Sequence, residues 1–145
     1  MAVAGTSELA GVKGSIPDPR DKEETVAGLE IKNAQQPDER RSMSGKGEVQ
    51  VVKLGEHSAM AGTWEPGWRW SEHMKPIAGT DSCEATHLIY AISGKMHVVM
   101  NDGTEGDIGP GDFASISPGH DAWVVGEEAF VGVDFGGYSQ YAKGS

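Results

Sequence analysis

Residues 67–120 have the sequence GWRWSEHMKPIAGTDSCEATHLIYAISGKMHVVMNDGTEGDIGPGDFASISPGH. This stretch contains four of the five histidines and the only cysteine of the chain. Its short segments of Val, Ile, Trp and Tyr are separated by Gly, Pro, Asn and Asp, which is the pattern of β-strands joined by tight turns. We therefore expect the strands that decide the fold, and any chemical site, to lie here.

The strand pattern continues on both sides of this stretch. Short apolar segments begin at about residue 47, and no amphipathic helix pattern interrupts them. The predicted strands are residues 48–54, 58–64, 68–74, 84–92, 95–100, 104–109, 112–117, 122–126 and 130–135. Many short strands without helices predict an all-β fold, either a sandwich or a barrel.

Turn residues indicate how the central strands pair. The sequence Asn-Asp-Gly at residues 101–103 supplies the positive φ that a tight hairpin requires. Ser93-Gly94 separates the two preceding strands in the same way. These turns predict three successive antiparallel strands between residues 84 and 109.

Composition limits the classes of function. A chain of 145 residues fits one domain with a sizeable core. Its 12 Lys and Arg against 22 Asp and Glu give a net charge of −10, which disfavours binding to nucleic acid or to an anionic membrane. We expect no membrane-spanning segment and no secretory signal. A single cysteine excludes an internal disulfide and is compatible with the reducing cytosol, so we expect a cytoplasmic protein.

Residues 1–44 differ from the rest of the chain. They are polar and rich in turn residues, and their hydrophobic side chains are too sparse to close a core. We expect an N-terminal arm, partly disordered, with a short strand near Gly28–Lys32 that packs on the barrel or on a partner subunit. The barrel domain would then be residues 45–145.

A hairpin between the predicted strands 68–74 and 84–92 would bring two histidines together. In an antiparallel pair of strands, the numbers of two residues that face each other always add up to the same value. A loop centred near Thr80 therefore sets His73 opposite His87. Cross-strand Cβ atoms are roughly 4.5–5.5 Å apart, close enough for two imidazoles to share a metal ion. The same spacing fits a hydrogen-bonded pair of half-buried histidines, and a register shift of one residue would separate them.

Two other residues are candidates for the same site. His120 follows the turn Pro118-Gly119, where a strand end would present it at the mouth of a barrel or simply in a turn. Cys83 lies four residues before His87 and fits either a metal ligand or a small buried thiol.

Tryptophans surround these segments. We expect Trp68, Trp70 and Trp123 to make one end of the barrel apolar and to line a pocket for a small organic ligand. Arg69 would hold a carboxylate or another anion of that ligand. The same rings also fit ordinary core positions, and the arginine fits a solvated surface.

These residues resemble the two sequence motifs of the cupin superfamily. The first motif runs from a Gly through His-x-His and Glu to a second Gly, and the second from Gly-Asp through Pro-Gly to a His. The matching positions are Gly67, His73, His87, Gly94, Gly111, Asp112, Pro118, Gly119 and His120. The resemblance implies a double-stranded β-helix jelly-roll barrel over about residues 47–136.

The sequence also departs from the cupin motifs. Lys75 stands at the position of the second His, and His87 stands at the position of the Glu. Ala122 stands where strict spacing puts the final His. His120 lies two residues earlier, a shift that keeps the same side of a strand.

A second alignment counts backwards from His87 and puts Asp81 and Cys83 at the His-x-His positions. The resemblance therefore leaves more than one ligand set open. The metal ligands that it implies are His73, His87 and His120, with Cys83 as a further candidate.

The cupin resemblance implies a metal-dependent enzyme that acts on a small organic molecule. Cupins commonly bind Fe, Mn, Ni, Cu or Zn as divalent ions, and three imidazoles leave positions open for a substrate. A redox metal would support a dioxygenase, and a Lewis-acid metal an isomerase or lyase. The candidate proton-transfer residues are Glu72, Glu84 and Tyr90.

Two other functions fit the same sequence. One is a non-catalytic module that binds or senses a small molecule or a metal, and the other is a barrel that serves only packing and dimerisation. In each case we expect a homodimer, because the apolar strands 48–54 and 130–135 would leave open edges in a monomer.

Overall fold

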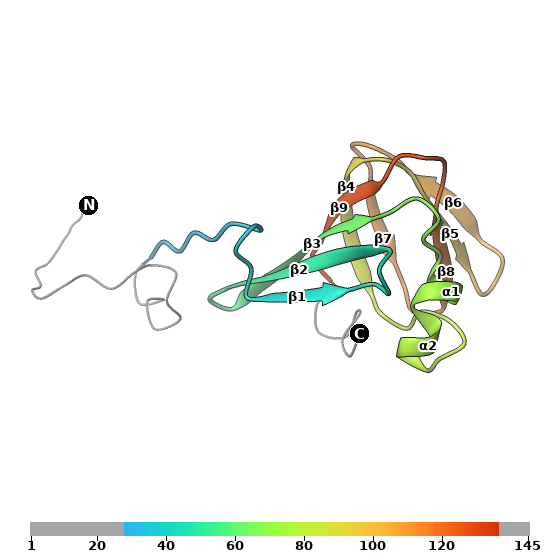
Figure 1. The fold of residues 1–145 in the computed structure, drawn as a ribbon, viewed down its shortest axis with the longest axis horizontal. Helices are drawn as coiled ribbons and strands as arrows, with labels where there is room; N and C mark the ends of the chain where they lie inside the picture. The colour runs from blue at the N-terminus through green and yellow to red at the C-terminus, as the bar shows by residue number, and fades with distance from the viewer. Residues whose placement is uncertain (1–27, 137–145) are drawn as a thin grey trace, which may run out of the picture. The chain divides into compact units, whose positions relative to one another are not determined.

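The structure is a computed structural model that describes residues 28–136 of the chain. This range forms nine strands and two short helices, which confirms the predicted all-β class (Figure 1). The strands are β1 (Glu39–Ser42), β2 (Gly47–Leu54), β3 (His57–Trp64), β4 (His87–Ser93), β5 (Met96–Met100), β6 (Glu105–Ile108), β7 (Phe113–Ile116), β8 (His120–Val124) and β9 (Phe130–Asp134), and the helices are α1 (Trp70–His73) and α2 (Lys75–Ala78). Within residues 28–136, no helix has the length and apolar character needed to cross a membrane.

The chain divides into two units, Met1–Lys32 and Asn33–Ser145. The described part of the first unit, residues 28–32, forms no strand, so the strand predicted there is wrong. The expected disorder of the start of the arm concerns residues that lie outside the described range. In the second unit, β1 forms inside the segment predicted to be an arm. Its sequence ERRS has no β-branched or aromatic residue, and pairing with β2 makes it a strand.

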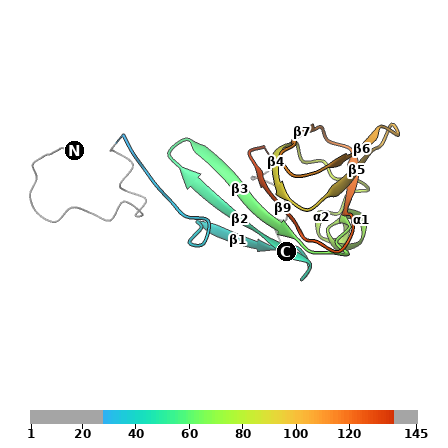
Figure 2. The same cartoon turned by 90° about the horizontal axis from the view of Figure 1, so that it is seen from above.

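The strands form two antiparallel sheets. The larger sheet has six strands in the order β1-β2-β3-β9-β4-β7, and the smaller has three in the order β6-β5-β8. Figure 2 shows β5 and β6 on the opposite side of the second unit from β1 and β2. Strands that are distant in sequence, such as β3 and β9, lie side by side. From β6 to β9 successive strands alternate between the two sheets, and two antiparallel sheets connected in this way are typical of a jelly roll.

Side chains alternate between the core and the surface along the strands. In β4 the side chains of His87, Ile89 and Ala91 are buried, and those of Leu88 and Tyr90 between them are exposed. This period of two is a property of the strand backbone. Because His87 belongs to the buried set, its imidazole lies inside the barrel.

The turn at Ser93-Gly94 carries the chain from one sheet to the other. β4 pairs with β7 and β9, and β5 pairs with β6 and β8, so the predicted pairing of β4 with β5 is wrong. Gly94 has a φ of 79°, and a Cβ at this position would lie 2.2 Å from the carbonyl oxygen of Ala129. This crossing requires glycine. The hairpin predicted at residues 101–103 is confirmed, because β5 pairs with β6 across it.

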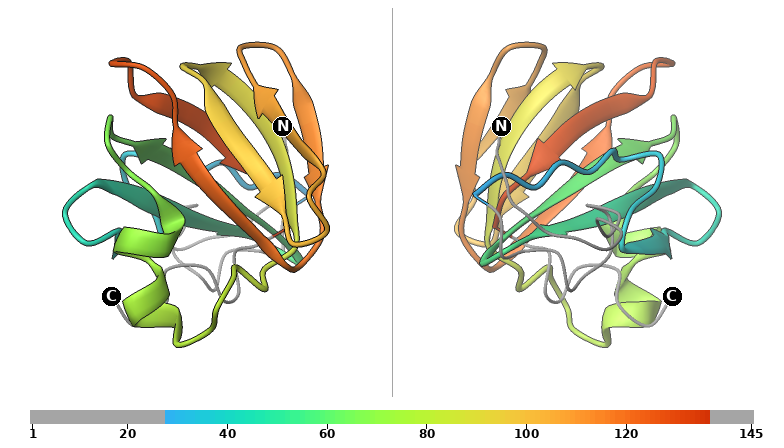
Figure 3. Two further views of the ribbon diagram at one scale, coloured as in Figure 1. Left: turned by 90° about the vertical axis from the view of Figure 1, so that its right-hand side faces the viewer. Right: turned by 90° about the vertical axis from the view of Figure 1, so that its left-hand side faces the viewer.

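The helix α1 replaces the strand predicted at residues 68–74, and α2 follows it directly. Trp70 and Met74 are both buried, and their separation of four residues places them on the same face of a helix. The backbone N–H of Ser71 donates to Asp121 Oδ1 at 3.0 Å, which ties the first turn of α1 to β8. Figure 3 shows α1 and α2 together at one end of the sheets.

The edges of the sheets differ from those predicted. β2 lies between β1 and β3, and β9 lies between β3 and β4, so neither is an open edge. Among the described strands, the edges are β1 and β7 in the larger sheet and β6 and β8 in the smaller. The predicted reason for dimerisation is therefore wrong.

Candidate metal centre

Cys83 lies in the loop before β4, where an antiparallel bridge joins it to the start of β8. The N–H of Cys83 donates to the carbonyl oxygen of His120 at 2.8 Å, and the N–H of Gly119 donates to the carbonyl oxygen of Cys83 at 2.7 Å. The Cys83 side chain is buried. The bridge therefore holds a thiol and an imidazole from distant parts of the sequence next to each other.

His87 is the first residue of β4, and Asp134 of β9 holds its ring. The carboxylate of Asp134 can only accept, so His87 Nδ1 carries a proton and donates it to Asp134 Oδ2. Asp134 is 1% exposed, and its Oδ1 accepts from the N–H of Leu88 at 3.2 Å and the N–H of Gly136 at 2.8 Å. These bonds fix the carboxylate, which in turn directs His87 Nε2 into the barrel.

His120 is oriented in a similar way by the backbone. Its Nδ1 lies 2.8 Å from the carbonyl oxygen of Ser117, and a carbonyl oxygen can only accept. His120 Nδ1 is therefore the donor in this bond, and Nε2 is the ring nitrogen left for a metal. His120 is 3% exposed, so its ring lies in the interior.

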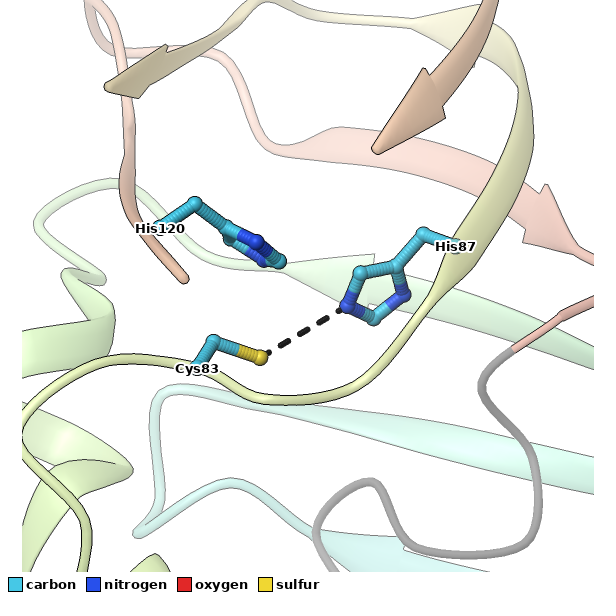
Figure 4. A group of neighbouring side chains, drawn as sticks. All are labelled: Cys83, His87 and His120. Atoms are coloured by element: carbon cyan, nitrogen blue, oxygen red, sulfur yellow. Dashed lines mark hydrogen bonds between the residues drawn. The ribbon is translucent and has the colours of Figure 1, made fainter. Parts of the chain in front are cut away.

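The three side chains converge (Figure 4). One nitrogen from each of His87 and His120 and the sulfur of Cys83 lie within 4.8 Å of one another, and all three residues are buried. Cys83 Sγ is 3.7 Å from His87 Nε2, and the two imidazole rings meet edge to face with centroids 5.3 Å apart. A thiolate and two imidazoles whose remaining nitrogens are already bonded are a donor set suited to a transition metal.

Burial and hydrogen bonding act in opposite directions on the pKa values of this cluster. Burial raises the pKa of the Cys83 thiol, but hydrogen bonds with His120 and His87 outweigh it and lower the pKa to about 6. Burial lowers the pKa of His87, but the bond to Asp134 outweighs it and raises the pKa to about 9. Burial also raises the pKa of Asp134, and the bond from His87 brings it below the ordinary value. At neutral pH the metal-free cluster therefore favours a thiolate at Cys83, a carboxylate at Asp134 and an imidazolium at His87, whose Nε2 proton would leave when a metal binds.

A small cavity lies beside the cluster. Its volume is about 20 Å³, enough for one water molecule or ion, whereas sites for drug-sized ligands occupy roughly 300–1,000 Å³. Its lining is mainly apolar and comprises Trp64, Trp68, Trp70, Cys83, His87, Ile89, Met96, Ile116, His120 and Ala122. Trp68 Nε1 is the one buried side-chain nitrogen or oxygen in the described residues that has no hydrogen-bond partner.

Comparisons with known proteins identify the fold. No protein-family model matches the sequence, and no curated protein matches it. An RmlC-like cupin from Shewanella frigidimarina superposes with a TM-score of 0.52 and 15% identity, over 77% of this chain and 94% of the other. This chain has the cupin fold.

Two further solved structures superpose less closely. KdgF from a Halomonas species has a TM-score of 0.48 and 16% identity, over 68% of this chain and 87% of its own. A protein with a double-stranded β-helix domain from Klebsiella pneumoniae has a TM-score of 0.45 and 24% identity, over 70% of this chain and 84% of its own.

Within the cupin barrel, the alignment counted backwards from His87 describes the site better than the one that starts at His73. It places Cys83 at a His-x-His position, and the structure brings Cys83 together with His87 and His120. Asp81, at the other position of that pair, is exposed and lies 3.8 Å from Lys75 in an ion pair. This carboxylate takes no part in the cluster.

His73 lies apart from the other predicted ligands. It is the last residue of α1, and its Nδ1 is 3.1 Å from both the amide nitrogen and the carbonyl oxygen of Arg69. The predicted cross-strand pair of His73 and His87 is wrong, because the segment that contains His73 is helical and pairs with no part of β4. A helical turn satisfies the ring of this histidine locally.

Of the four residues predicted to form a substrate pocket, two line the cavity and two lie outside it. Trp68 and Trp70 are buried and line the cavity. Trp123 lies on the outer side of β8, because its neighbours in the strand, Ala122 and Val124, are the buried ones. The Arg69 guanidinium lies over the Trp123 ring, 4.0 Å from its centroid, and so also lies outside the cavity.

The three residues predicted to transfer protons do not line the cavity. Glu72 is exposed on α1 and lies 3.6 Å from Arg69. Glu84 is exposed and accepts a hydrogen bond from Ser82 at 3.0 Å. Tyr90 points outward from β4 and contacts the Phe113 ring, with centroids 4.7 Å apart and the ring planes tilted by 47°. Alternation along β4 explains the last of these, because His87 and Ile89 take the inner positions.

Asp134 is the functional residue that the sequence analysis missed. The sequence does contain a pattern that points to Asp134. Phe130, Gly132 and Asp134 alternate along β9 and so share one side of the strand, and an acidic residue on the side that faces the core needs a partner. The partner could not be found from the sequence, because His87 is 47 residues away along the chain.

Proposed function

We propose that this cupin binds one divalent transition metal through Cys83, His87 and His120 and uses it as a Lewis acid in an isomerase- or lyase-type reaction on a small molecule. The observation that carries the proposal is the convergence of three buried donor atoms within 4.8 Å. Three protein ligands leave a coordination position open, which is typical of catalytic rather than structural zinc sites.

The donor set favours zinc among the metals that cupins bind. Thiolates are soft ligands that select Zn or Cu, whereas Fe(II) oxygenases commonly use two His and one carboxylate. The carboxylate nearest this cluster, Asp134, is already bonded to His87 on the side away from Cys83. We therefore favour Lewis-acid chemistry over a dioxygenase.

Each residue of the site has a distinct part in this proposal. When bound, the metal would polarise a carbonyl or similar oxygen of the substrate. Cys83 and the two imidazoles would hold it, Asp134 and the Ser117 carbonyl keep the rings in orientation, and the tryptophans limit access of bulk water. A reducing cytosol would keep Cys83 as a thiolate ligand.

The second candidate function is a metal-binding or sensing module without catalysis. Two observations favour it: the cavity volume is only about 20 Å³, and Glu72, Glu84 and Tyr90 do not line the cavity. Under the enzymatic proposal, only the reacting end of the substrate enters the cavity.

Elemental analysis of protein purified without a metal-chelating step tests the metal. We expect about one equivalent of zinc per chain, lost in Cys83→Ser, His87→Ala and His120→Ala. His73→Ala is the matched control and should keep its metal, because His73 lies outside the cluster. Full metal content in both His87→Ala and His120→Ala, with circular dichroism unchanged, would disprove the site. Substrate-dependent oxygen uptake by the metal-loaded protein would instead support a dioxygenase.

We also propose that the chain forms a homodimer through an apolar patch on β4 and β7. The patch consists of Leu88, Tyr90, Ile92 and Phe113, which are 47%, 36%, 52% and 74% exposed. All four are uncharged, and a chain with a net charge of −10 can associate with its own copy most readily through an uncharged surface. β7 is also an edge strand of its sheet.

A further inference from the structure

The indole N–H of Trp68 is buried and unsatisfied. Trp68 is 2% exposed, and its Nε1 has no acceptor among the described residues. A buried donor without a partner destabilises the fold, and native structures contain few of them. An acceptor from outside the described chain would remove this destabilisation.

The surroundings of Trp68 indicate where such an acceptor would lie. Trp68 lines the cavity that also borders Cys83, His87 and His120, and the remaining lining is apolar. The Trp68 ring is held in place by Trp64, which meets it edge to face with centroids 6.4 Å apart. The cavity is therefore the space next to Trp68 in which a ligand could stand beside the three donor atoms.

We infer that Trp68 donates a hydrogen bond to a small ligand that binds in this cavity beside the metal. The volume of about 20 Å³ restricts what enters to about the size of one water molecule, such as the terminal atom of a small anion or one group of a substrate. An N–H donor selects an acceptor such as the oxygen or nitrogen of a small anion. Trp68 is thus a positioning and selectivity residue, and this inference rests on the proposed metal site.

The indole N–H of Trp68 can be observed directly by NMR, because the protein has only four tryptophans and therefore four indole N–H signals. Nitrogen-15-labelled, zinc-loaded protein is titrated with azide and followed by two-dimensional NMR. We expect the Trp68 indole proton to move downfield by the largest amount and that of Trp123, which lies outside the cavity, to stay in place. The Trp68 signal is assigned through its contact with the Trp64 ring, so the measurement does not require a variant.

A pair of variants then gives the strength of the bond. Trp68→Phe removes the N–H, and we expect about tenfold weaker binding of azide with zinc content unchanged. Trp70→Phe removes a similar volume from the same cavity but not the fully buried, unsatisfied N–H of Trp68, and we expect azide affinity to stay the same.

The outcomes separate this inference from the proposed function. Failure to bind zinc would overturn the metal site, and the inference with it. Zinc binding without azide binding, or azide binding that leaves the Trp68 signal unmoved, would overturn the inference and leave the metal site intact. Equal weakening by Trp68→Phe and Trp70→Phe would likewise assign the effect to volume and overturn the role of the N–H.

Discussion

The orientation of each donor in the candidate metal centre depends on a second residue. Asp134 sets the orientation of the His87 ring, and the carbonyl of Ser117 that of the His120 ring. Such supporting bonds set the tautomer and raise the basicity of the ligating nitrogen. At the scale of single residues, metal affinity should therefore respond to groups that do not touch the metal.

Asp134→Asn tests this dependence. The amide keeps the shape of the side chain but replaces a carboxylate that accepts from His87, Leu88 and Gly136. We expect zinc affinity to fall about 10–100-fold, measured by competition with a chromogenic chelator. Asp121→Asn is the control and should bind zinc as the native chain does, because this β8 carboxylate accepts from the N–H of Ser71 in α1 and not from a residue of the cluster. Unchanged affinity in Asp134→Asn would show that the carboxylate has no supporting role.

His97 provides a pH-dependent contribution to stability that is separate from the metal centre. Its ring lies 2.6 Å from Asp107 and 2.7 Å from Glu105, and these hydrogen bonds raise the pKa of His97. The ring also packs on Trp123, over which the Arg69 guanidinium lies. Because folding raises the pKa of His97, the stability that its protonated ring contributes is fully present below the pKa of the unfolded chain. This stability is lost as the pH rises through the pKa of His97 in the folded protein.

His97→Gln should therefore cost more stability at pH 5.5 than at pH 9. The difference should be at most about 1 kcal/mol, because the carboxylates that pair with His97 are exposed. Urea denaturation of both proteins at the two pH values measures it. A cost that does not change with pH would mean that the ring contributes by packing on Trp123 alone.

At the scale of elements, the connections decide which strands share a sheet. The Ser93-Gly94 turn sends β5 into the smaller sheet, and the Cys83–His120 bridge closes the loop in front of β4. Both features depend on the conformation of the backbone. A substitution that disturbs the backbone at either place should therefore destabilise the whole barrel.

Gly94→Ala tests the sheet-crossing turn. A Cβ would lie 2.2 Å from the carbonyl oxygen of Ala129 in a backbone with φ of 79°, so both the contact and the conformation are unfavourable. We expect a loss of about 3 kcal/mol in the free energy of unfolding. Gly103→Ala is the control, because it has a similar positive φ but nothing within 4 Å of the added atom, and should cost less. Equal losses in the two variants would assign the effect to backbone conformation alone.

At the scale of the whole molecule, the proposed dimer depends on an apolar surface of a strongly acidic chain. Phe113→Glu adds a charge at the most exposed residue of the patch on β4 and β7. We expect the native chain to be a dimer and the variant a monomer by light scattering at micromolar concentration. Val125→Glu adds the same charge at an apolar residue outside the patch and should leave the dimer intact. A native monomer would contradict the dimer, and a dimeric Phe113→Glu would contradict this interface.

The candidate site could be predicted in part. Cys83, His87 and His120 were proposed from their spacing and from the cupin motifs, whereas His73 was proposed from a predicted hairpin that set it opposite His87 and from its spacing after Gly67. Trp70 and Met74 also have helical spacing, and the contact of Ser71 with Asp121 favours the helix. Periodicity in a segment of seven residues cannot decide between these structures without that contact.

What the sequence by itself determined is the all-β class, most strand positions and the side of each strand that faces the core. These depend on side-chain alternation and on glycine turns, which act between near neighbours. Only the tertiary structure decided which strands share a sheet, which donors converge and which carboxylate supports them. The reason is that Cys83 meets His120, and His87 meets Asp134, through backbone pairing and packing between segments far apart in the chain, and no local pattern encodes those distances.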